Sequence, residues 1–315
     1  MLRRRYMSRF RFSVRTMLVA TAVLSALLGL VGNEVQQLRF HRQAVRRVRE
    51  LGGSCGSVVG NSFGESWGPK WCPLIKDSMY ADFECVWLNS TGNAGLRDED
   101  LAVLKHFPRL RVVEFSAPLL TDVAMTHLGE IDSLRELTLY ETQVTGQGLR
   151  RLRGISLEML VLGGPAVTDE MLKALDAFPL LRKLMITESS VTDKGLENLA
   201  HVPRLEKLYL SRSPLGDASM NHLSNLTRLQ ELDLIGLAIS DDGIAPLAAL
   251  TRLRSLTVVN TSVTAAGLTK LHGAPALKSL GFGPLPAPDT LMTLETALPG
   301  CQVSDASGYR CLSGW

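Results

Sequence analysis

Residues 181–204 read LRKLMITESSVTDKGLENLAHVPR, and residues 205–228 repeat the pattern as LEKLYLSRSPLGDASMNHLSNLTR. A unit of this length cannot bury its own apolar face, so several units must stack to share one core. The period is 23 or 24 residues, and the leucines that open the units are Leu110, Leu134, Leu157, Leu181, Leu205, Leu229, Leu253 and Leu277. So regular a period predicts a solenoid.

Each unit combines a strand pattern with a helix pattern. Aliphatic residues at alternating positions, such as Leu184 and Ile186, predict a short strand with one buried face. The sequence V-T-D-x-G-L at 191–196, or a relative of it, recurs in later and earlier units. Its Thr can cap a helix, and the Asp beside it complements the positive end of the helix dipole. Apolar residues three apart, such as Leu196 and Leu199, then suit one face of a short helix.

These two patterns, over roughly residues 83–290, resemble the leucine-rich repeat family. The V-T-D-x-G-L variant is similar to that of bacterial membrane-anchored leucine-rich repeat proteins, notably planctomycete ones, and to the repeats of F-box adaptors. The resemblance implies an α/β fold, a right-handed solenoid or horseshoe with a parallel sheet on its concave face and short helices on its convex face.

The chain departs from that family three positions after the last strand leucine, where Asn or Cys is most common. The residues here are Pro118, Thr142, Pro165, Ser189, Ser213, Leu237 and Thr261. Hydroxyls can bond backbone groups in place of Asn, but Pro and Leu cannot. We therefore expect an interrupted polar ladder.

A basic and then an apolar segment precede the repeats. Residues 1–15 contain six arginines and no acid, and an apolar run covers residues 17–32. We interpret residues 1–15 as a basic cytoplasmic N-terminus and residues 16–33 as an uncleaved transmembrane signal anchor, with a cleaved signal peptide as the alternative. The positive-inside rule favours this N-in topology, with the repeats outside the cytoplasm, although five further arginines at 39–49 reduce the bias.

Residues 34–51 are predicted to form a juxtamembrane helix with an apolar stripe. Its arginines could contact lipid phosphates, or the stripe could pack on itself or on the first repeat. Residues 52–82 are expected to be a linker and an N-terminal cap, in which Trp71 and Leu74 cover the first repeat. Residues 291–315 are expected to form a C-terminal cap.

Charge divides the chain near residue 50. The first 50 residues contain eleven basic and two acidic residues, whereas the rest contains 23 basic and 29 acidic ones. The formal net charge of +3 therefore comes from the segment near the membrane. The acidic repeats give no support to nucleic-acid binding.

No sequence pattern indicates catalysis or a metal site. Residues 60–64, GNSFG, match the spacing of a hydrolase nucleophile elbow around Ser62, but the required strand and helix do not flank them. The six histidines do not form an H-E-x-x-H motif, and the five cysteines do not form a Cys-x-x-Cys motif. We therefore expect a protein that is not an enzyme and uses no cofactor or metal ion.

The cysteines lie at the two ends of the chain, outside the regular repeats. A disulfide there would stabilise the ends of an exported solenoid. Cys301 with Cys311 is the preferred pair, and Cys55 with Cys72 is the second. Reduced thiols in apolar packing are the alternative.

Partner-binding residues are expected between the strand leucines, where side chains point out from the concave face. The middle units place an apolar and aromatic centre there with charged residues around it, which is the composition of a protein interface. The predicted protein-binding residues are Tyr140, Met159, Val161, Met185, Tyr209 and Ile235, with Lys183, Lys207, Arg212 and Asp233 at the border. Scattered exposed apolar residues are also ordinary on a sheet, so that alternative stays open.

The sequence thus favours a non-enzymatic, membrane-anchored recognition or scaffold protein that binds a protein partner through its concave face. An F-box-like adaptor of a ubiquitin ligase is one alternative, although residues 34–82 lack the helical trio of an F-box. An architectural envelope protein without a discrete ligand is another.

Overall fold

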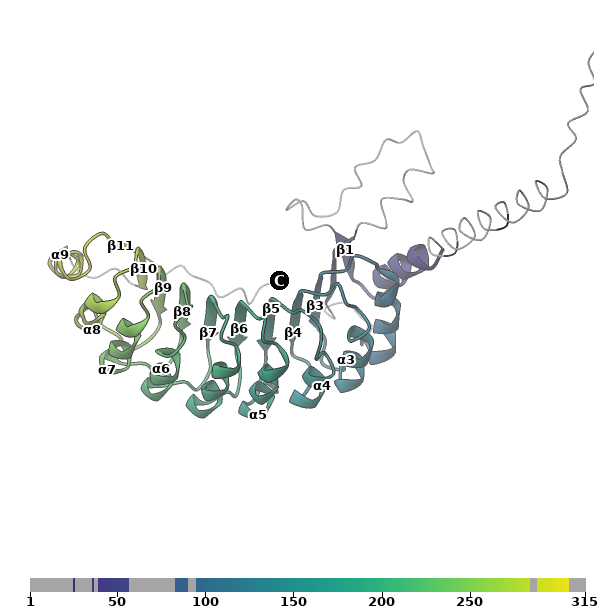
Figure 1. Cartoon of the computed structure of the whole chain (residues 1–315), viewed down its shortest axis with the longest axis horizontal. Helices are drawn as coiled ribbons and strands as arrows, with labels where there is room; N and C mark the ends of the chain where they lie inside the picture. The colour runs from purple at the N-terminus through teal and green to yellow at the C-terminus, as the bar shows by residue number, and fades with distance from the viewer. Residues whose placement is uncertain are drawn as a thin grey trace, which may run out of the picture.

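The computed structural model describes residues 39–56, 83–89, 95–283 and 288–305, together with the single positions 25 and 36. In this part of the chain, eleven strands form one sheet in sequence order (Figure 1). β1 is antiparallel to β2, and every later strand is parallel to its neighbours. The strands line one side of a curved molecule and the helices line the other. This architecture is a leucine-rich repeat solenoid.

The strands are β1 Ser54–Gly56, β2 Cys85–Asn89, β3 Val112–Ser116, β4 Glu136–Tyr140, β5 Met159–Gly163, β6 Lys183–Thr187, β7 Lys207–Ser211, β8 Glu231–Ile235, β9 Ser255–Val259, β10 Ser279–Gly283 and β11 Gln302–Asp305. The α-helices are α3 Asp122–Leu128, α4 Gly146–Arg150, α5 Asp169–Leu172, α6 Asp217–Leu223, α7 Asp241–Ile244, α8 Ala265–Thr269 and α9 Pro288–Ala297. The 3-10 helices are η2 Asp98–His106, η3 Lys173–Ala177, η4 Asp193–His201, η5 Ala245–Ala249 and η6 Lys270–Gly273.

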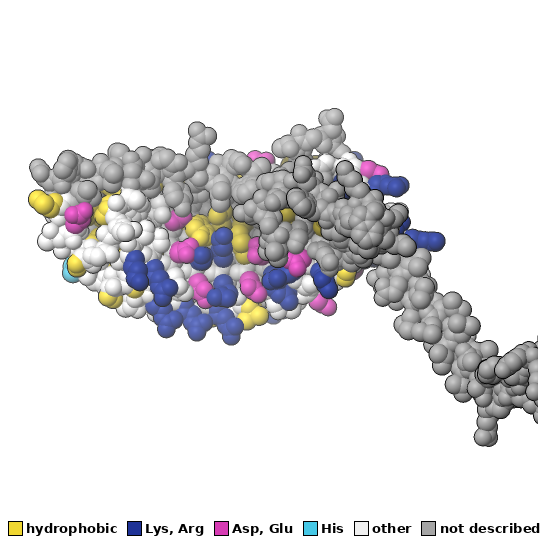
Figure 2. Space-filling model, turned by 90° about the horizontal axis from the view of Figure 1, so that it is seen from above, with side chains coloured by type: hydrophobic (Ala, Val, Ile, Leu, Met, Phe, Trp, Pro, Cys, Tyr) yellow, Lys and Arg dark blue, Asp and Glu magenta, His cyan; other side chains and the backbone are white. Residues whose placement is uncertain are grey.

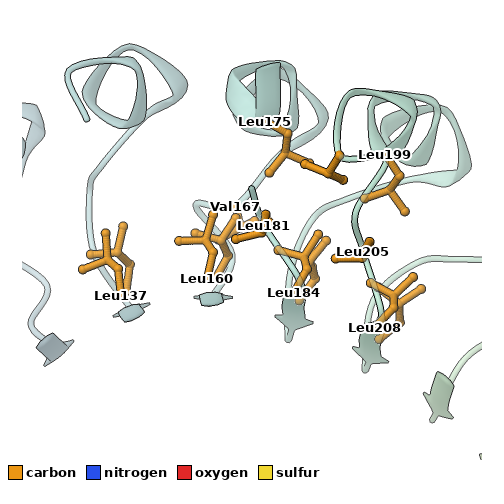
Figure 3. Close-up of a cluster of buried hydrophobic side chains, with 14 of the residues drawn as sticks. Leu137, Leu160, Val167, Leu175, Leu181, Leu184, Leu199, Leu205 and Leu208 are labelled. Carbon is orange, nitrogen blue, oxygen red and sulfur yellow. The ribbon is translucent and has the colours of Figure 1, made fainter. Parts of the chain in front are cut away.

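The repeat period places equivalent leucines side by side in the core. Leu184 pairs with Leu160 on one neighbouring strand and with Leu208 on the other, and all three are fully buried. Figure 3 shows them facing Leu175 and Leu199 of the convex helices. One continuous apolar cluster therefore runs through the stacked repeats, as the sequence predicted.

Where a helix begins with aspartate, that aspartate bonds to the following repeat. Asp217 Oδ1 accepts a hydrogen bond from the Ser240 amide at 2.7 Å, and Asp217 Oδ2 accepts one from the Ser240 hydroxyl at 2.6 Å. The same pair of bonds joins Asp98 to Thr121, Asp122 to Thr145, Asp169 to Thr192 and Asp241 to Thr264. From the sequence, each aspartate was expected only to stabilise its own helix. The hydrogen bonds show that it also joins one repeat to the next.

The glycine of the V-T-D-x-G-L motif makes room for that aspartate. A Cβ atom on Gly243 would lie 2.1 Å from Asp217 Oδ1, and the same clash would occur at three equivalent glycines, Gly148, Gly195 and Gly267. One pair of repeats reverses the arrangement, because Gly146 replaces the aspartate and Met171 replaces the next glycine. In this pair of repeats, the small residue is therefore at the aspartate position and the larger side chain is at the glycine position.

The helix at residues 39–50 packs on the first repeat. Ala44, Val45 and Val48 are buried in the same cluster as the core leucines of η2. Arg47 Nη2 lies 2.8 Å from Asp100 Oδ1 at the edge of this contact. Of the alternatives for the predicted juxtamembrane helix, packing on the first repeat is thus the one observed, and the helix serves as an N-terminal cap.

The ends of the solenoid extend beyond the regular units. β1 lies in the segment expected to be a linker, and Trp71 and Leu74 fall outside the described residues. α9 and β11 make up most of the described residues 288–305, so the parallel sheet continues into the expected C-terminal cap. None of the described helices combines the length and apolar character needed to cross a bilayer. The predicted anchor at 16–33 lies outside the described residues except for position 25.

The polar ladder is interrupted as expected. Ser189 Oγ and Ser213 Oγ lie 2.8 Å apart, and Thr261 Oγ1 accepts a hydrogen bond from the Val263 amide at 3.3 Å. Leu237 instead buries its side chain at the same position.

Three of the cysteines lie in the described residues. Cys55, Cys85 and Cys301 are free thiols there, with Cys85 and Cys301 buried. Cys72 and Cys311 fall outside the described residues, so both expected disulfides remain predictions.

Candidate protein-binding face

Parallel strands of equal register form rows of side chains across the concave face. Met159, Lys183, Lys207 and Glu231 are in one row. Val161, Met185, Tyr209 and Asp233 are in the next. Figure 2 looks onto this side of the molecule and shows charged side chains of both signs beside hydrophobic ones.

Tyr209 is the centre of a cluster of interacting charges. Lys183 Nζ lies 5.2 Å from the centroid of the Tyr209 ring, in the position of a cation–π contact. The Tyr209 hydroxyl donates to Glu231 Oε2 at 3.0 Å, and Lys207 Nζ lies 2.8 Å from Glu231 Oε1. We call these four residues the Tyr209 cluster. Its contacts hold an aromatic ring in place on the surface.

Glu231 keeps its charge in this cluster. Burial alone would raise the pKa of Glu231, but the hydrogen bonds from Lys207 and Tyr209 and the nearby lysine charges lower it further than burial raises it. The net pKa is below the ordinary value for a glutamate. The cluster thus presents two cations and one anion around the phenol ring at neutral pH.

A second group joins three repeats. The Tyr140 hydroxyl donates to Glu188 Oε2, and Arg212 Nη1 lies 2.6 Å from Glu188 Oε1. The Tyr140 ring passes over Gly163 of the intervening strand, because a Cβ atom there would lie 2.2 Å from the ring. The hydrogen bond to Glu188 raises the pKa of Tyr140 to about 12, with burial adding to the effect. Bonds from Tyr140 and Arg212 lower the pKa of Glu188.

Glu188 and Arg212 occupy strained backbone positions. Their φ angles are 51° and 47°, in the left-handed region. The equivalent residues of two neighbouring repeats are Gly164 and Gly236. A side chain in this conformation costs about 1 kcal/mol. At the carboxyl ends of β6 and β7, two charged residues therefore adopt a backbone conformation that glycine adopts at lower energy.

Three of the predicted binding residues are buried, so the expectation that they are exposed is wrong. Val161 and Asp233 are each 7% exposed and Ile235 is 6% exposed. Ile235 forms a small apolar cluster with Val259 of the next strand. The neighbouring side chains of the same row cover each of them, since adjacent strands are only about 4.8 Å apart.

The other predicted residues are at least partly accessible. Tyr140, Met159, Met185, Lys183 and Lys207 are half-buried. Arg212 and Tyr209 are also accessible in part. Glu231 and Gly163 were not among the binding residues predicted from the sequence. The 24-residue spacing of Lys207 and Glu231 was the available signal for the first, because equivalent positions of successive repeats are neighbours.

The chemistry of the face suits binding. Among the described residues, no group of three or more histidine, cysteine or acidic side chains could hold a metal ion. The clusters offer an aromatic ring, thioethers and paired charges, which are groups that make contacts between proteins.

The chain matches no family model and no curated protein. It does resemble solved structures. Internalin C2 from Listeria monocytogenes strain 4b F2365 is 21% identical with a TM-score of 0.44, and the match covers 66% of this chain and 84% of that one. TLR13 in a complex with ssRNA13 is 15% identical with a TM-score of 0.46, and the match covers 67% of this chain and 34% of that one.

Proposed function

We propose that this chain is a non-enzymatic recognition protein that binds a protein partner through the concave face. The observation that carries the proposal is the Tyr209 cluster, where Lys183 and Glu231 fix a tyrosine ring beside Met185. Tyrosine with surrounding charges is typical of the few residues that supply most of the energy of an interface.

The geometry lowers the cost of binding. A side chain that is already held loses less rotamer freedom when a partner docks. Tyr209 is held through its ring by Lys183 and through its hydroxyl by Glu231. Met159 and Met185 are flexible and polarisable, so they can adapt to an irregular partner surface. The face thus combines a fixed anchor with an adaptable border.

The proposal includes membrane anchoring with the repeats outside the cytoplasm. Its support is the arginine-rich start of the chain followed by the apolar run at 17–32. Protease treatment of intact cells tests this part. Cleavage of the repeats from outside is expected, after permeabilisation of any outer envelope. Repeats that are cleaved only after the inner membrane is opened would contradict the topology.

The test of the binding face is a double variant with a matched control. Met185→Asp with Tyr209→Asp should abolish crosslinking to the partner in native membranes, because it places two acids at the centre of the face. Leu119→Asp with Val123→Asp changes two exposed apolar residues away from the strands, at 47% and 51% exposure, and should leave it unchanged. Circular dichroism checks that both fold. Retained crosslinking in the concave variant would refute the proposal.

A further inference from the structure

Exposed basic residues follow one edge of the sheet in the C-terminal half. Arg204, Arg228 and Arg252 occupy the same position of the turns before β7, β8 and β9. Arg254 and Lys278 immediately precede β9 and β10. All five are exposed, and we call them the basic edge. Figure 2 shows Lys and Arg side chains gathered along one edge of the molecule.

The repeat makes the basic edge a regular array. Backbone hydrogen bonds of 2.8 Å from Arg254 to Gln230 and of 2.9 Å from Lys278 to Arg254 join its successive turns. Neighbouring strands are about 4.8 Å apart, so equivalent residues follow at that pitch. The edge is therefore a line of positive charge across four repeats.

The array lacks the pairing found elsewhere in the protein. Arg182 pairs with Glu206 at 2.9 Å, and Arg153 pairs with Asp176 at 2.8 Å. Within the described ranges, none of the five residues of the basic edge makes an ion pair. Like charges in a line repel one another and raise the local positive potential. An anionic ligand would relieve that repulsion.

We propose that the basic edge binds an acidic segment of a protein partner. This inference rests on the proposed function, since it assigns part of the partner to a second surface beside the concave face. Three consecutive equivalent positions hold arginine rather than lysine. The planar guanidinium donates paired hydrogen bonds to a carboxylate, so these positions suit aspartate and glutamate side chains.

Other polyanions fit less well. Single-stranded nucleic acid needs aromatic side chains for base stacking, and the turns that carry the edge contain none. A lipid surface usually takes apolar residues as well, but the exposed large apolar side chains of the described residues, Phe40, Leu119, Val123 and Met292, belong to other parts of the fold.

The test measures binding of a fluorescent glutamate dodecapeptide to the full chain in phosphatidylcholine nanodiscs. We expect binding that weakens with salt. The variant Arg204→Glu with Arg228→Glu and Arg252→Glu should lose at least about tenfold in affinity. The control variant combines Arg150→Glu, Arg151→Glu and Arg153→Glu. It makes the same change of net charge in and directly after α4 on the convex side, so its affinity for the peptide should stay within about twofold of that of the natural chain.

Three outcomes overturn the inference. They are no peptide binding by the natural chain, equal losses in the two triple variants, and tighter binding of a thymidine dodecanucleotide or of phosphatidylserine vesicles than of the peptide. The concave variant Met185→Asp with Tyr209→Asp should still bind the glutamate peptide but should no longer bind the protein partner. If peptide binding fails while partner capture is retained, this inference is wrong and the proposed function is unaffected.

Discussion

Replacing Gly243 by alanine tests how the repeats are joined. The new methyl group would lie 2.1 Å from Asp217 Oδ1, far closer than van der Waals contact allows. Asp217 must then shift and strain its bonds to the amide and the hydroxyl of Ser240. Ala124 stands at the equivalent position beside Asp98, where both bonds to Thr121 are kept, so the bonds should weaken rather than break. The change therefore weakens a contact between two repeats, although the residue that is substituted takes part in neither hydrogen bond.

The expected loss follows from those two bonds. A hydrogen bond to a charged group contributes about 1.5–3 kcal/mol, and the two here share one carboxylate. Alanine returns about 1 kcal/mol of helix propensity relative to glycine. With the two bonds weakened rather than lost, the free energy of unfolding should fall by about 1–2 kcal/mol.

A double-mutant cycle in urea, followed by circular dichroism, separates this cause from others. In an Asp217→Gly background the methyl group meets no carboxylate, so Gly243→Ala should cost little or stabilise. Gly146 and Met171 show that the exchange occurs within this protein. An equal cost of Gly243→Ala in both backgrounds would show that the lost stability does not come from the contact with Asp217.

Three further changes probe other parts of the fold. Burial raises the pKa of Asp233 above its unfolded value, so its charge costs stability at neutral pH. Asp233→Asn should therefore raise the urea midpoint at pH 7, with a difference that shrinks as the pH falls toward about 4, and equal midpoints at pH 7 would count against this. Burial and the nearby Glu136 and Glu84 raise the pKa of Cys85 to about 12, so iodoacetamide at pH 8 should modify it only after unfolding, and fast native labelling by mass spectrometry would contradict this. Val48→Ala should destabilise the N-terminal cap by about 2 kcal/mol and speed proteolysis of the first repeat, whereas unchanged protection would argue against the cap.

The period of the leucines was enough to predict stacked repeats with one strand each, and the resemblance to leucine-rich repeat proteins implied the parallel sheet that the structure has. The repeats were predicted to begin near residue 83, before the cleanest units, and β2 confirms it. The capping prediction is confirmed only in part. The hydroxyls of Thr121, Thr145 and Ser240 each accept from the amide two residues later, whereas the helix starts at Thr168, Thr192 and Thr264 have no side-chain cap bond. These features depend on local spacing, which a sequence displays directly.

Contacts between repeats were harder to predict. The bond from Ser240 to Asp217 joins positions 23 residues apart, and only the paired departures at Gly146 and Met171 hinted at it. The sequence could not decide whether the apolar stripe that contains Val48 packs against lipid or against the first repeat, because both accept the same apolar residues. The burial of Val161 and Ile235 depends on how closely the curved sheet brings the rows together. Alternation along a strand gives the direction of a side chain but not what covers it.

The central claim is that a protein partner docks around Tyr209 on the concave face. Photo-crosslinking in the cells that make the protein tests it most directly, with benzoylphenylalanine placed at Met185 or, as the convex control, at Val123. We expect a discrete protein adduct from the Met185 position, which disappears when Tyr209→Asp is added, and none from the Val123 position. No adduct from Met185, or the same adducts from both positions, would contradict it.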